Sequence, residues 1–349
     1  MRKVTYKNIH NFFRFNGEHF DSNGMRVAAY YLIKEGDEYE KAIGEFLLDW
    51  FDDKPYIDLQ TSGTTGTPKL IRKNKQALVN SALATGDFFD LKPGDTALCC
   101  LPVQFIAGKM MLVRSFILGL AIDFVSPSSN PLEKVNKFYD FVAMVPLQVE
   151  NSLNQLHCVR KLIIGGAKMS NSLEEKLLNS GTKIYETYGM TETITHIAAK
   201  EIGEKVFSTL PNVSISEDEN NCLVIDALRV SEERLFTNDL VQIINDHQFV
   251  LLGRIDNVVN SGGVKLIPEQ IEEKLTPFIP NRFFVGGIPD AVLGEKLALV
   301  IEGEKQDLEE SIFSDLNKYE KPKAIFFIPE FKTTESGKIK RKAILKELE

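Results

Sequence analysis

The segment Tyr56-Ile-Asp-Leu-Gln-Thr-Ser-Gly-Thr-Thr-Gly-Thr-Pro-Lys69 is the part of the sequence that best indicates the fold. The first four residues predict a short strand, and the Thr- and Gly-rich remainder predicts a loop. Glycine lets the backbone approach an anion closely, while successive N–H groups, hydroxyls and Lys69 supply donors and positive charge. The loop is either a phosphate cradle or a polar turn, and its spacing differs from the Walker A pattern.

The order of strand, loop and helix continues along the chain. Residues 75–89 and 173–178 predict helices, and on the N-terminal side residues 26–52 predict helical structure with apolar residues at helical spacing. Short apolar segments predict strands at 97–101, 121–125, 141–145, 161–164 and 183–186. Strands separated by helices are typical of α/β layering with a largely parallel sheet, which binds ligands at the carboxyl ends of its strands.

The sequence changes in character after about residue 205. Short apolar segments at 222–225 and 240–244 predict a small β-rich part, and a domain boundary is predicted near 253–256. The expected fold class is therefore α/β. Residues 1–253 should form a large N-terminal domain with parallel sheets and a small β-rich part, and residues 254–349 a small α+β domain.

Composition excludes several classes of protein. The 349 residues carry 49 acidic and 41 basic side chains, a net charge of −8 that argues against nucleic acid as a partner. The longest apolar stretch, residues 110–125, contains Arg114 and Asp123 and is too short to insert into a membrane. Four scattered cysteines show no metal-ligand spacing, so we expect reduced thiols in a cytoplasmic protein. The oligomeric state stays open.

Five motifs occur in a specific order along the chain. They are Thr61–Lys69, Tyr188-Gly-Met-Thr-Glu-Thr193, Thr237-Asn-Asp239, the glycine-bounded segment 253–263, and Gly337-Lys338. The ordered set resembles the core motifs of the adenylate-forming superfamily, which includes acyl-CoA synthetases, luciferases and peptide-synthetase adenylation domains. The resemblance implies an enzyme that uses ATP and Mg²⁺ to activate a carboxylate. Compared with that family, the chain is short before residue 61, and Asn238 replaces the usual glycine.

The resemblance also implies which residues bind the nucleotide. The implied ATP-binding residues are Thr61, Ser62, Gly63, Thr64, Thr65, Gly66, Lys69, Gly165, Gly166, Ala167, Tyr188, Gly189, Asp239 and Arg254. Within this set, the Tyr188 ring would stack on adenine and Asp239 would accept hydrogen bonds from the ribose. Gly165 and Gly166 fit a tight strand–turn junction equally well.

Catalysis is implied for Lys338, Thr191 and Glu192. Lys338 would bridge the carboxylate and the nucleotide, Thr191 would hold phosphate, and Glu192 would be the Mg²⁺ ligand. Without the motif, Lys338 would be one more cation of a basic tail. The small C-terminal domain of the family rotates about a hinge that corresponds to Asp256. After rotation, coenzyme A (CoA) would bind at a final group of residues, namely Ser261, Gly262, Gly263 and Lys265.

The segment 101–114 resembles the corresponding segment of o-succinylbenzoate–CoA ligases of menaquinone biosynthesis, although Phe105 and Ala107 depart from it. The implied substrate-binding residues are Gly108, Arg114 and His196. A buried arginine requires an anion, so Arg114 meets either a second substrate carboxylate or an internal acid. His196 is either a pocket residue or a packed one. The alternatives to this ligase are a CoA ligase for another aryl or short acyl acid, and a nucleotide-binding regulator without turnover.

Overall fold

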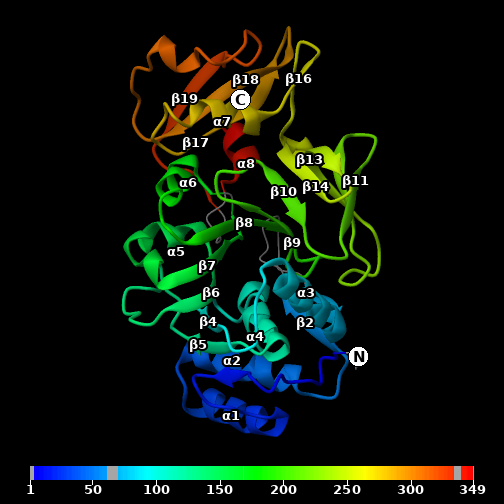
Figure 1. The fold of residues 1–349 in the computed structure, drawn as a ribbon. Helices are drawn as coiled ribbons and strands as arrows, with labels where there is room; N and C mark the ends of the chain where they lie inside the picture. Colours follow the sequence, from blue (N-terminus) through cyan, green and yellow to red (C-terminus); the bar gives the residue numbers. More distant parts are fainter. Residues whose placement is uncertain (1–3, 61–69, 168, 334–338, 349) are drawn as a thin grey trace. The chain divides into compact units, whose positions relative to one another are not determined.

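The computed structural model describes residues 4–60, 70–167, 169–333 and 339–348 (Figure 1). The chain divides into two compact units. The first comprises Met1–Met169, Leu173–Ser214 and Asp226–Leu235, and the second comprises Ser170–Ser172, Ile215–Ile225 and Phe236–Glu349. The predicted domain boundary at residues 253/254 falls inside the second unit and stays a prediction.

Two helices, α1 (Ser22–Glu35) and α2 (Glu38–Trp50), cover most of the region that was predicted to be helical, residues 26–52. Gly36 separates the two helices: it ends the first, with its N–H donating to the Leu32 carbonyl. Asp37 then begins the second helix with a capping box, in which the Glu40 carboxylate accepts from the Asp37 N–H at 2.8 Å.

The first unit contains a mixed sheet with strand order β1-β5-β4-β6-β7-β8-β9-β10. All pairs from β1 to β8 are parallel, whereas β9 and β10 join antiparallel. The strands β5, β4, β6, β7 and β8 follow one another in this order in Figure 1. The bounds are β1 (Arg14–Phe15), β4 (Thr96–Cys99), β5 (Ala121–Phe124), β6 (Tyr139–Met144), β7 (Val159–Ile164), β8 (Lys183–Gly189), β9 (His196–Glu201) and β10 (Val206–Thr209). The predicted α/β class with a largely parallel sheet is confirmed.

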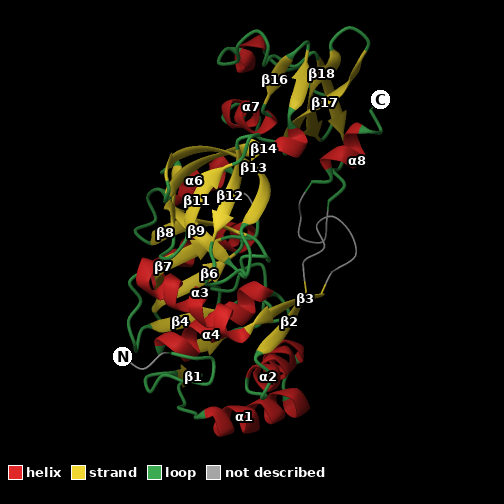
Figure 2. Cartoon of the chain, turned by 90° about the vertical axis from the view of Figure 1, so that its right-hand side faces the viewer, coloured by secondary structure: helices red, strands yellow, loops and turns green. Residues whose placement is uncertain are grey.

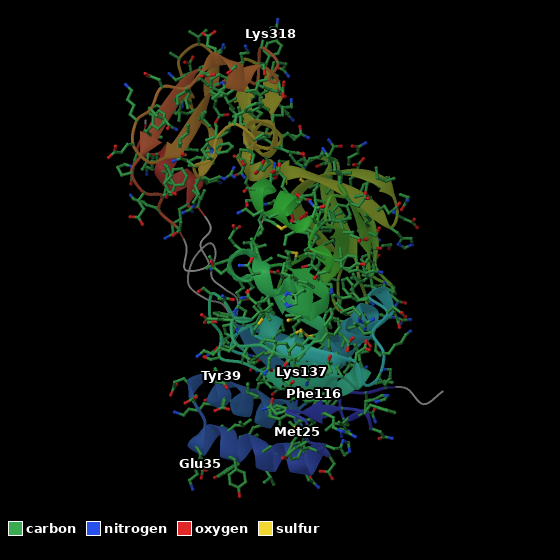
Figure 3. All side chains as sticks on the ribbon, turned by 60° about the vertical axis from the view of Figure 1, so that its left-hand side comes forward. Met25, Glu35, Tyr39, Phe116, Lys137 and Lys318 are labelled. Atoms are coloured by element: carbon green, nitrogen blue, oxygen red, sulfur yellow. The ribbon has the colours of Figure 1, made fainter. Side chains whose placement is uncertain are left out.

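Helices and one further pair of strands complete this unit. The helices are α3 (Lys75–Phe88), α4 (Ile106–Leu118), α5 (Pro146–Asn151) and α6 (Asn171–Leu177), with a 3₁₀ turn at Leu153–Cys158. The predicted strand at 56–59 is present as β2 (Tyr56–Gln60), but it pairs only with β3 (Leu70–Asn74) in a separate antiparallel sheet (Figure 2). The core includes the fully buried Met25 of α1 and Phe116 of α4 (Figure 3).

The second unit holds two groups of strands. One has the order β14-β13-β12-β11, with bounds Gln248–Arg254, Leu235–Asn245, Cys222–Asp226 and Ser214–Glu217. The other is a five-stranded sheet of β16 (Val264–Leu266), β15 (Val259–Ser261), β18 (Gly294–Glu302), β17 (Phe283–Asp290) and β19 (Ala324–Ile328). Alternate residues of β17 and β18 face opposite sides, so each face carries its own apolar cluster. Helices α7 (Pro268–Leu275) and α8 (Arg341–Leu345) and short 3₁₀ turns at Ile255–Asn257 and Glu310–Phe313 accompany this sheet.

The four cysteines are all free thiols. Cys99, Cys100 and Cys222 are buried, and Cys158 is half-buried. Burial raises the pKa of the Cys99 thiol to about 12 and that of Cys100 further still. Within the described ranges, no helix combines the length and the apolar character needed to cross a membrane.

Candidate active site

The carboxyl end of β7 leads into the predicted adenine-lining residues. The Gly165 N–H donates to the Met144 carbonyl at 3.2 Å, and Gly166 adopts a φ of +85°. A Cβ on Gly165 would lie 2.6 Å from the Thr187 hydroxyl, which donates to the Ile164 carbonyl. Glycine is therefore required here for tight strand–turn packing. The nucleotide-binding roles of these glycines and of the half-buried Ala167 stay predictions.

The next strand, β8, delivers the motif at 188–193. A Cβ on Gly189 would lie 2.4 Å from the Thr195 carbonyl oxygen, so the chain folds back very closely on itself. The Thr193 hydroxyl holds this turn together, because it lies 2.8 Å from both the Met190 and the Thr195 carbonyl oxygens. Ile194 is buried with a φ of 70°, a conformation that is unfavourable for a β-branched residue.

Tyr188 lies on the last part of β8 with its ring half-buried. Its ring packs edge to face against Phe207, with the two centroids 6.1 Å apart. This contact fixes one edge of the ring. Its predicted stacking on adenine stays a prediction.

Lys73 contacts the predicted metal-binding residue and was missed in the sequence. Its Nζ donates to the Glu192 backbone carbonyl at 2.6 Å. Burial lowers the pKa of Lys73, and the nearby Glu192 carboxylate offsets part of this lowering. The sequence around Lys73 shows only the alternating pattern of a strand, β3. That pattern does not indicate that Lys73 contacts a residue 119 positions away.

The Glu192 carboxylate makes no hydrogen bond or ion pair with any described residue. No described group of three or more His, Cys, Asp or Glu side chains forms a complete metal cage. Mg²⁺ commonly takes one or two carboxylates together with substrate phosphates, so a single unengaged carboxylate beside Thr191 fits this ion.

Helix α4 carries the predicted substrate residues Arg114 and Gly108. A Cβ on Gly108 would lie 2.5 Å from the Pro102 carbonyl oxygen, so glycine lets the helix pack on the preceding chain. Arg114 is only 1% exposed. Its Nε has no hydrogen-bond partner, and no carboxylate pairs with it among the residues that the structure describes. Burial lowers the pKa of Arg114 to about 9.

Arg114 and His196 are joined through Thr195 by a chain of polar groups, most of them buried. Arg114 Nη2 donates to Thr195 Oγ1 at 3.3 Å, and Thr195 Oγ1 lies 3.3 Å from His196 Nδ1. On the other side, His196 Nε2 lies 3.3 Å from the Thr85 hydroxyl, which already donates to the Ser81 carbonyl. One tautomer therefore satisfies every group: neutral His196 donates from Nε2 and accepts at Nδ1. Burial and then Arg114 lower the pKa of His196 well below 6.5, which favours this neutral form.

The second unit brings together three of the predicted nucleotide and hinge residues. Arg254 Nη1 lies 3.2 Å from Asp239 Oδ1, and Arg254 Nη2 lies 3.0 Å from Asp256 Oδ2. Asn238 also donates to Asp256 at 3.1 Å. Arg254 is the first cause that lowers the pKa of Asp256, so this carboxyl stays ionised.

The predicted CoA-binding residues form a hairpin between β15 and β16. Gly262 and Gly263 have φ values of 58° and 83°, the pattern of a two-residue hairpin turn that only glycine adopts easily. Ser261 ends β15, and Lys265 pairs with Asn260 across the hairpin with its side chain exposed. Thr61–Lys69 and Lys338 lie outside the described residues, so their predicted roles stay predictions.

Comparison with known proteins agrees with the order of the motifs. The family model for AMP-binding enzymes matches residues 51–228, about half of the chain. An acyl-CoA synthetase (AMP-forming)/AMP-acid ligase II-like protein from Dyadobacter fermentans is 35% identical, with 93% of this chain and 98% of that chain covered and a TM-score of 0.63.

Two further relatives carry more specific names. The 2-succinylbenzoate–CoA ligase of Lactococcus lactis is 26% identical in an alignment of 325 positions that covers 85% of this chain and 72% of that protein. The o-succinylbenzoate CoA synthetase of Bacillus subtilis, solved with ATP and a magnesium ion, has the same fold at 21% identity, with a TM-score of 0.70 and coverage of 82% and 68%. The chain belongs to the family of AMP-binding enzymes, as an acid–CoA ligase of the adenylate-forming type.

Proposed function

We propose that this ligase converts o-succinylbenzoate to o-succinylbenzoyl-CoA in the cytoplasm, as a step of menaquinone biosynthesis. The observation that carries the choice of acid is Arg114, a buried cation without a carboxylate partner among the described residues. A substrate with two carboxylates can offer one to the reaction and the second to this guanidinium. The relative from Lactococcus lactis, named for the same acid, supports the choice.

In the proposed pocket, Arg114 binds the second carboxylate. His196 and Thr195 hold the guanidinium in place through the polar chain. Gly108 keeps α4 close to the preceding chain and so sets the position of Arg114. Neutral His196 adds no second charge beside Arg114, so the guanidinium is the cation that this pair offers to the carboxylate.

On the nucleotide side, Thr61–Lys69 would bind the β- and γ-phosphates, and Asp239 and Arg254 the ribose. The substrate carboxylate oxygen attacks the α-phosphorus, the bond to the β-phosphate breaks, and pyrophosphate leaves. Lys338 would stabilise the negative charge of this step, and Thr191 would hold a phosphate oxygen. Bound Mg²⁺, held by Glu192, would neutralise charge on the phosphates. Lys73 keeps the Glu192 backbone in place.

For the second half of the reaction, we propose that residues 254–349 rotate about Asp256 as a domain. The CoA thiol would then attack the acyl carbon of the acyl-AMP, and AMP would leave. The hairpin at 261–265 suits a slender pantetheine arm, because Gly262 and Gly263 have no side chains. Lys265 would contact a CoA phosphate.

An assay over a panel of acids tests the reaction and its substrate together. The purified protein is incubated with ATP, Mg²⁺ and CoA, and AMP, pyrophosphate and thioester are measured. We expect product with o-succinylbenzoate and much less with benzoate or short acyl acids. Robust product with another acid alone would replace the proposed substrate. No AMP with any acid would instead favour a nucleotide-binding regulator.

The role of Lys338 is tested by separating the two halves of the reaction. Lys338→Ala should abolish acyl-AMP formation, because the variant lacks the cation at the attacking carboxylate. Thioester formation from supplied acyl-AMP should persist. Equal loss of both halves would contradict the assigned role.

A further inference from the structure

Helix α7 presents two carboxylates on one face. Glu269 and Glu272 are three residues apart, so both project from the same side of the helix. Glu272 is only 8% exposed, and its Oε1 accepts from the Val285 N–H at 2.9 Å. Burial raises the pKa of the Glu272 carboxyl, so the helix needs a cation at this position to keep the charge.

Arg341 of α8 supplies that cation. Its Nη1 and Nη2 lie 2.7 and 2.9 Å from the two carboxylate oxygens of Glu272, a bidentate pair. The same Nη1 lies 3.8 Å from Glu269 Oε1. The guanidinium also lies over the Phe284 ring, 5.5 Å from its centroid. Its position is therefore fixed in both distance and orientation.

The chain directly before Arg341 is also held. Thr333 and Ile339 form an antiparallel β-bridge, and the Lys340 N–H donates to the Lys332 carbonyl at 2.8 Å. Residues 334–338, which include Lys338, connect the two bridged residues in the chain. The bridge fixes the two ends relative to each other, and Arg341 fixes the bridge to α7.

The other carboxylate of α7 contacts the predicted hinge. Asn257 Nδ2 lies 2.5 Å from Glu269 Oε1, and Asn257 is the residue directly after Asp256. A Cβ on Gly253 would lie 2.5 Å from Glu269 Oε2, so the carboxylate also lies against the backbone at the start of the hinge segment. Glu272 thus connects α7 to the segment that follows Lys338, and Glu269 connects α7 to the hinge segment.

We propose that Arg341, through its bidentate pair with Glu272, is a positioning residue for Lys338. It attaches the chain three residues after Lys338 to α7, the helix whose Glu269 contacts the hinge. The chain that follows Lys338 and the helix that contacts the hinge then move as one body when the domain rotates. This inference rests on the proposed function, because it assigns a task to the proposed catalytic lysine.

Apolar packing holds the same segment but gives it no defined direction. Ile344 lies in an apolar cluster with Phe284 and Phe331, and apolar contacts are non-directional. A bidentate arginine–carboxylate pair specifies distance and angle together. We therefore expect the loss of the pair to affect the half-reaction that needs Lys338 more than the one that does not.

The test uses the full chain and three variants. Arg341→Met should lower acyl-AMP formation about 100-fold, since a displacement of about 1 Å at a reacting group costs that much. Thioester formation from supplied acyl-AMP should change less than about threefold. Arg341→Met/Glu272→Gln removes both charges and should recover most of the stability, as removal of both partners of a buried pair does, but not the adenylation. Lys346→Met, an exposed lysine of the same segment, is the matched control.

Two results would overturn the proposal. One is recovery of adenylation in the double variant together with stability, since the pair would then act only on folding. The other is an additive effect in a cycle with Lys338→Ala: if Arg341 acts through Lys338, its substitution should have no further effect once the lysine is absent.

Hydrogen exchange separates this proposal from the proposed function. Residues 339–348 should exchange faster in Arg341→Met than in Lys346→Met, whether or not the right acid has been found. Unchanged exchange with intact wild-type adenylation rejects the positioning role alone. Faster exchange in Arg341→Met, together with a wild-type protein that adenylates no acid, rejects the proposed function and retains the attachment of the segment to α7.

Discussion

Two arginines, the fully buried Arg114 in one unit and the half-buried Arg341 in the other, differ in how far the protein supplies their partners. Arg341 has a bidentate carboxylate partner, a second carboxylate at 3.8 Å and an aromatic ring beneath it. Arg114 is more deeply buried, yet it has one hydroxyl at 3.3 Å, a thioether sulfur at 3.7 Å and an unpartnered Nε. The chain carries 49 acidic residues, and among the described ones none pairs with Arg114.

The difference shows how a structural cation differs from one that awaits a ligand. A buried charge is costly unless it is paired. Selection for stability alone would therefore place an acid beside Arg114 or an uncharged residue at position 114. The pair at Arg341 is complete without any substrate. The incomplete set of partners at Arg114 is explained if the missing anion arrives with the substrate.

The largest expected effect is on catalysis at Arg114. Arg114→Met should lower kcat/KM for o-succinylbenzoate by about 100-fold, which corresponds to about 3 kcal/mol for a lost charge-assisted pair, with little change in the KM for ATP. Steady-state kinetics with two acids measures this. A monocarboxylic acid such as benzoate is the control, and an equal loss for both acids would refute a role in binding the second carboxylate.

The next effect is on stability at Arg341. Arg341→Met should lower the free energy of unfolding by about 2 kcal/mol, because it leaves Glu272 buried and unpaired. The value lies below that for a fully buried pair because the Arg341 side chain is 24% exposed. Urea denaturation followed by circular dichroism measures it, with Lys346→Met as the control. A stability equal to that of the control would show that the pair contributes nothing.

A smaller effect of opposite sign is expected for stability at Arg114. Arg114→Met should leave the free energy of unfolding unchanged or raise it by about 1 kcal/mol, because an uncompensated buried charge is removed. Trp50, the single tryptophan, is buried in the first unit with its ring 6.2 Å from Phe116 of α4, so its fluorescence follows this unit. A loss of more than about 2 kcal/mol would mean that Arg114 has a protein partner after all.

The smallest effect concerns pH. The pKa of folded His196 lies well below 6.5, so below that pH the unfolded chain binds more protons, and stability is lost as the pH falls. Arg114 is one cause of this shift, and Arg114→Met should therefore weaken the loss, by less than about 1 kcal/mol. Denaturation measured at several values between about pH 5 and 7 tests this, because an unfolded histidine titrates in that range. His196→Asn serves as the control that removes the titration, and an unchanged pH profile in that control would show that His196 is not its source.

The alternation of strands and helices was predictable, because buried parallel strands such as β4, β6 and β7 are short apolar runs. The family was also predictable, since its motifs are local in sequence. The break at Gly36 was visible in principle, because Asp37 and Glu40 have the spacing of a capping box.

Contacts between distant segments could not be predicted in the same way. Lys73 meets the Glu192 carbonyl across 119 positions, and Arg341 meets Glu272 across 69. Both partners of each contact are polar residues of a common kind, and only the fold brings them together. For Arg114, its apolar surroundings in the sequence predicted a buried cation that needs an anion, and the structure adds that the described chain supplies none.

The buried thiols give the protein its own chemical reporters. Cys99 and Cys100 lie on or directly after a central strand of the first unit, and Cys222 begins a strand of the second. Thiols with raised pKa values react slowly with alkylating reagents until the chain around them opens. Mass spectrometry of the alkylated peptides would thus time the opening of each unit separately, without any introduced label.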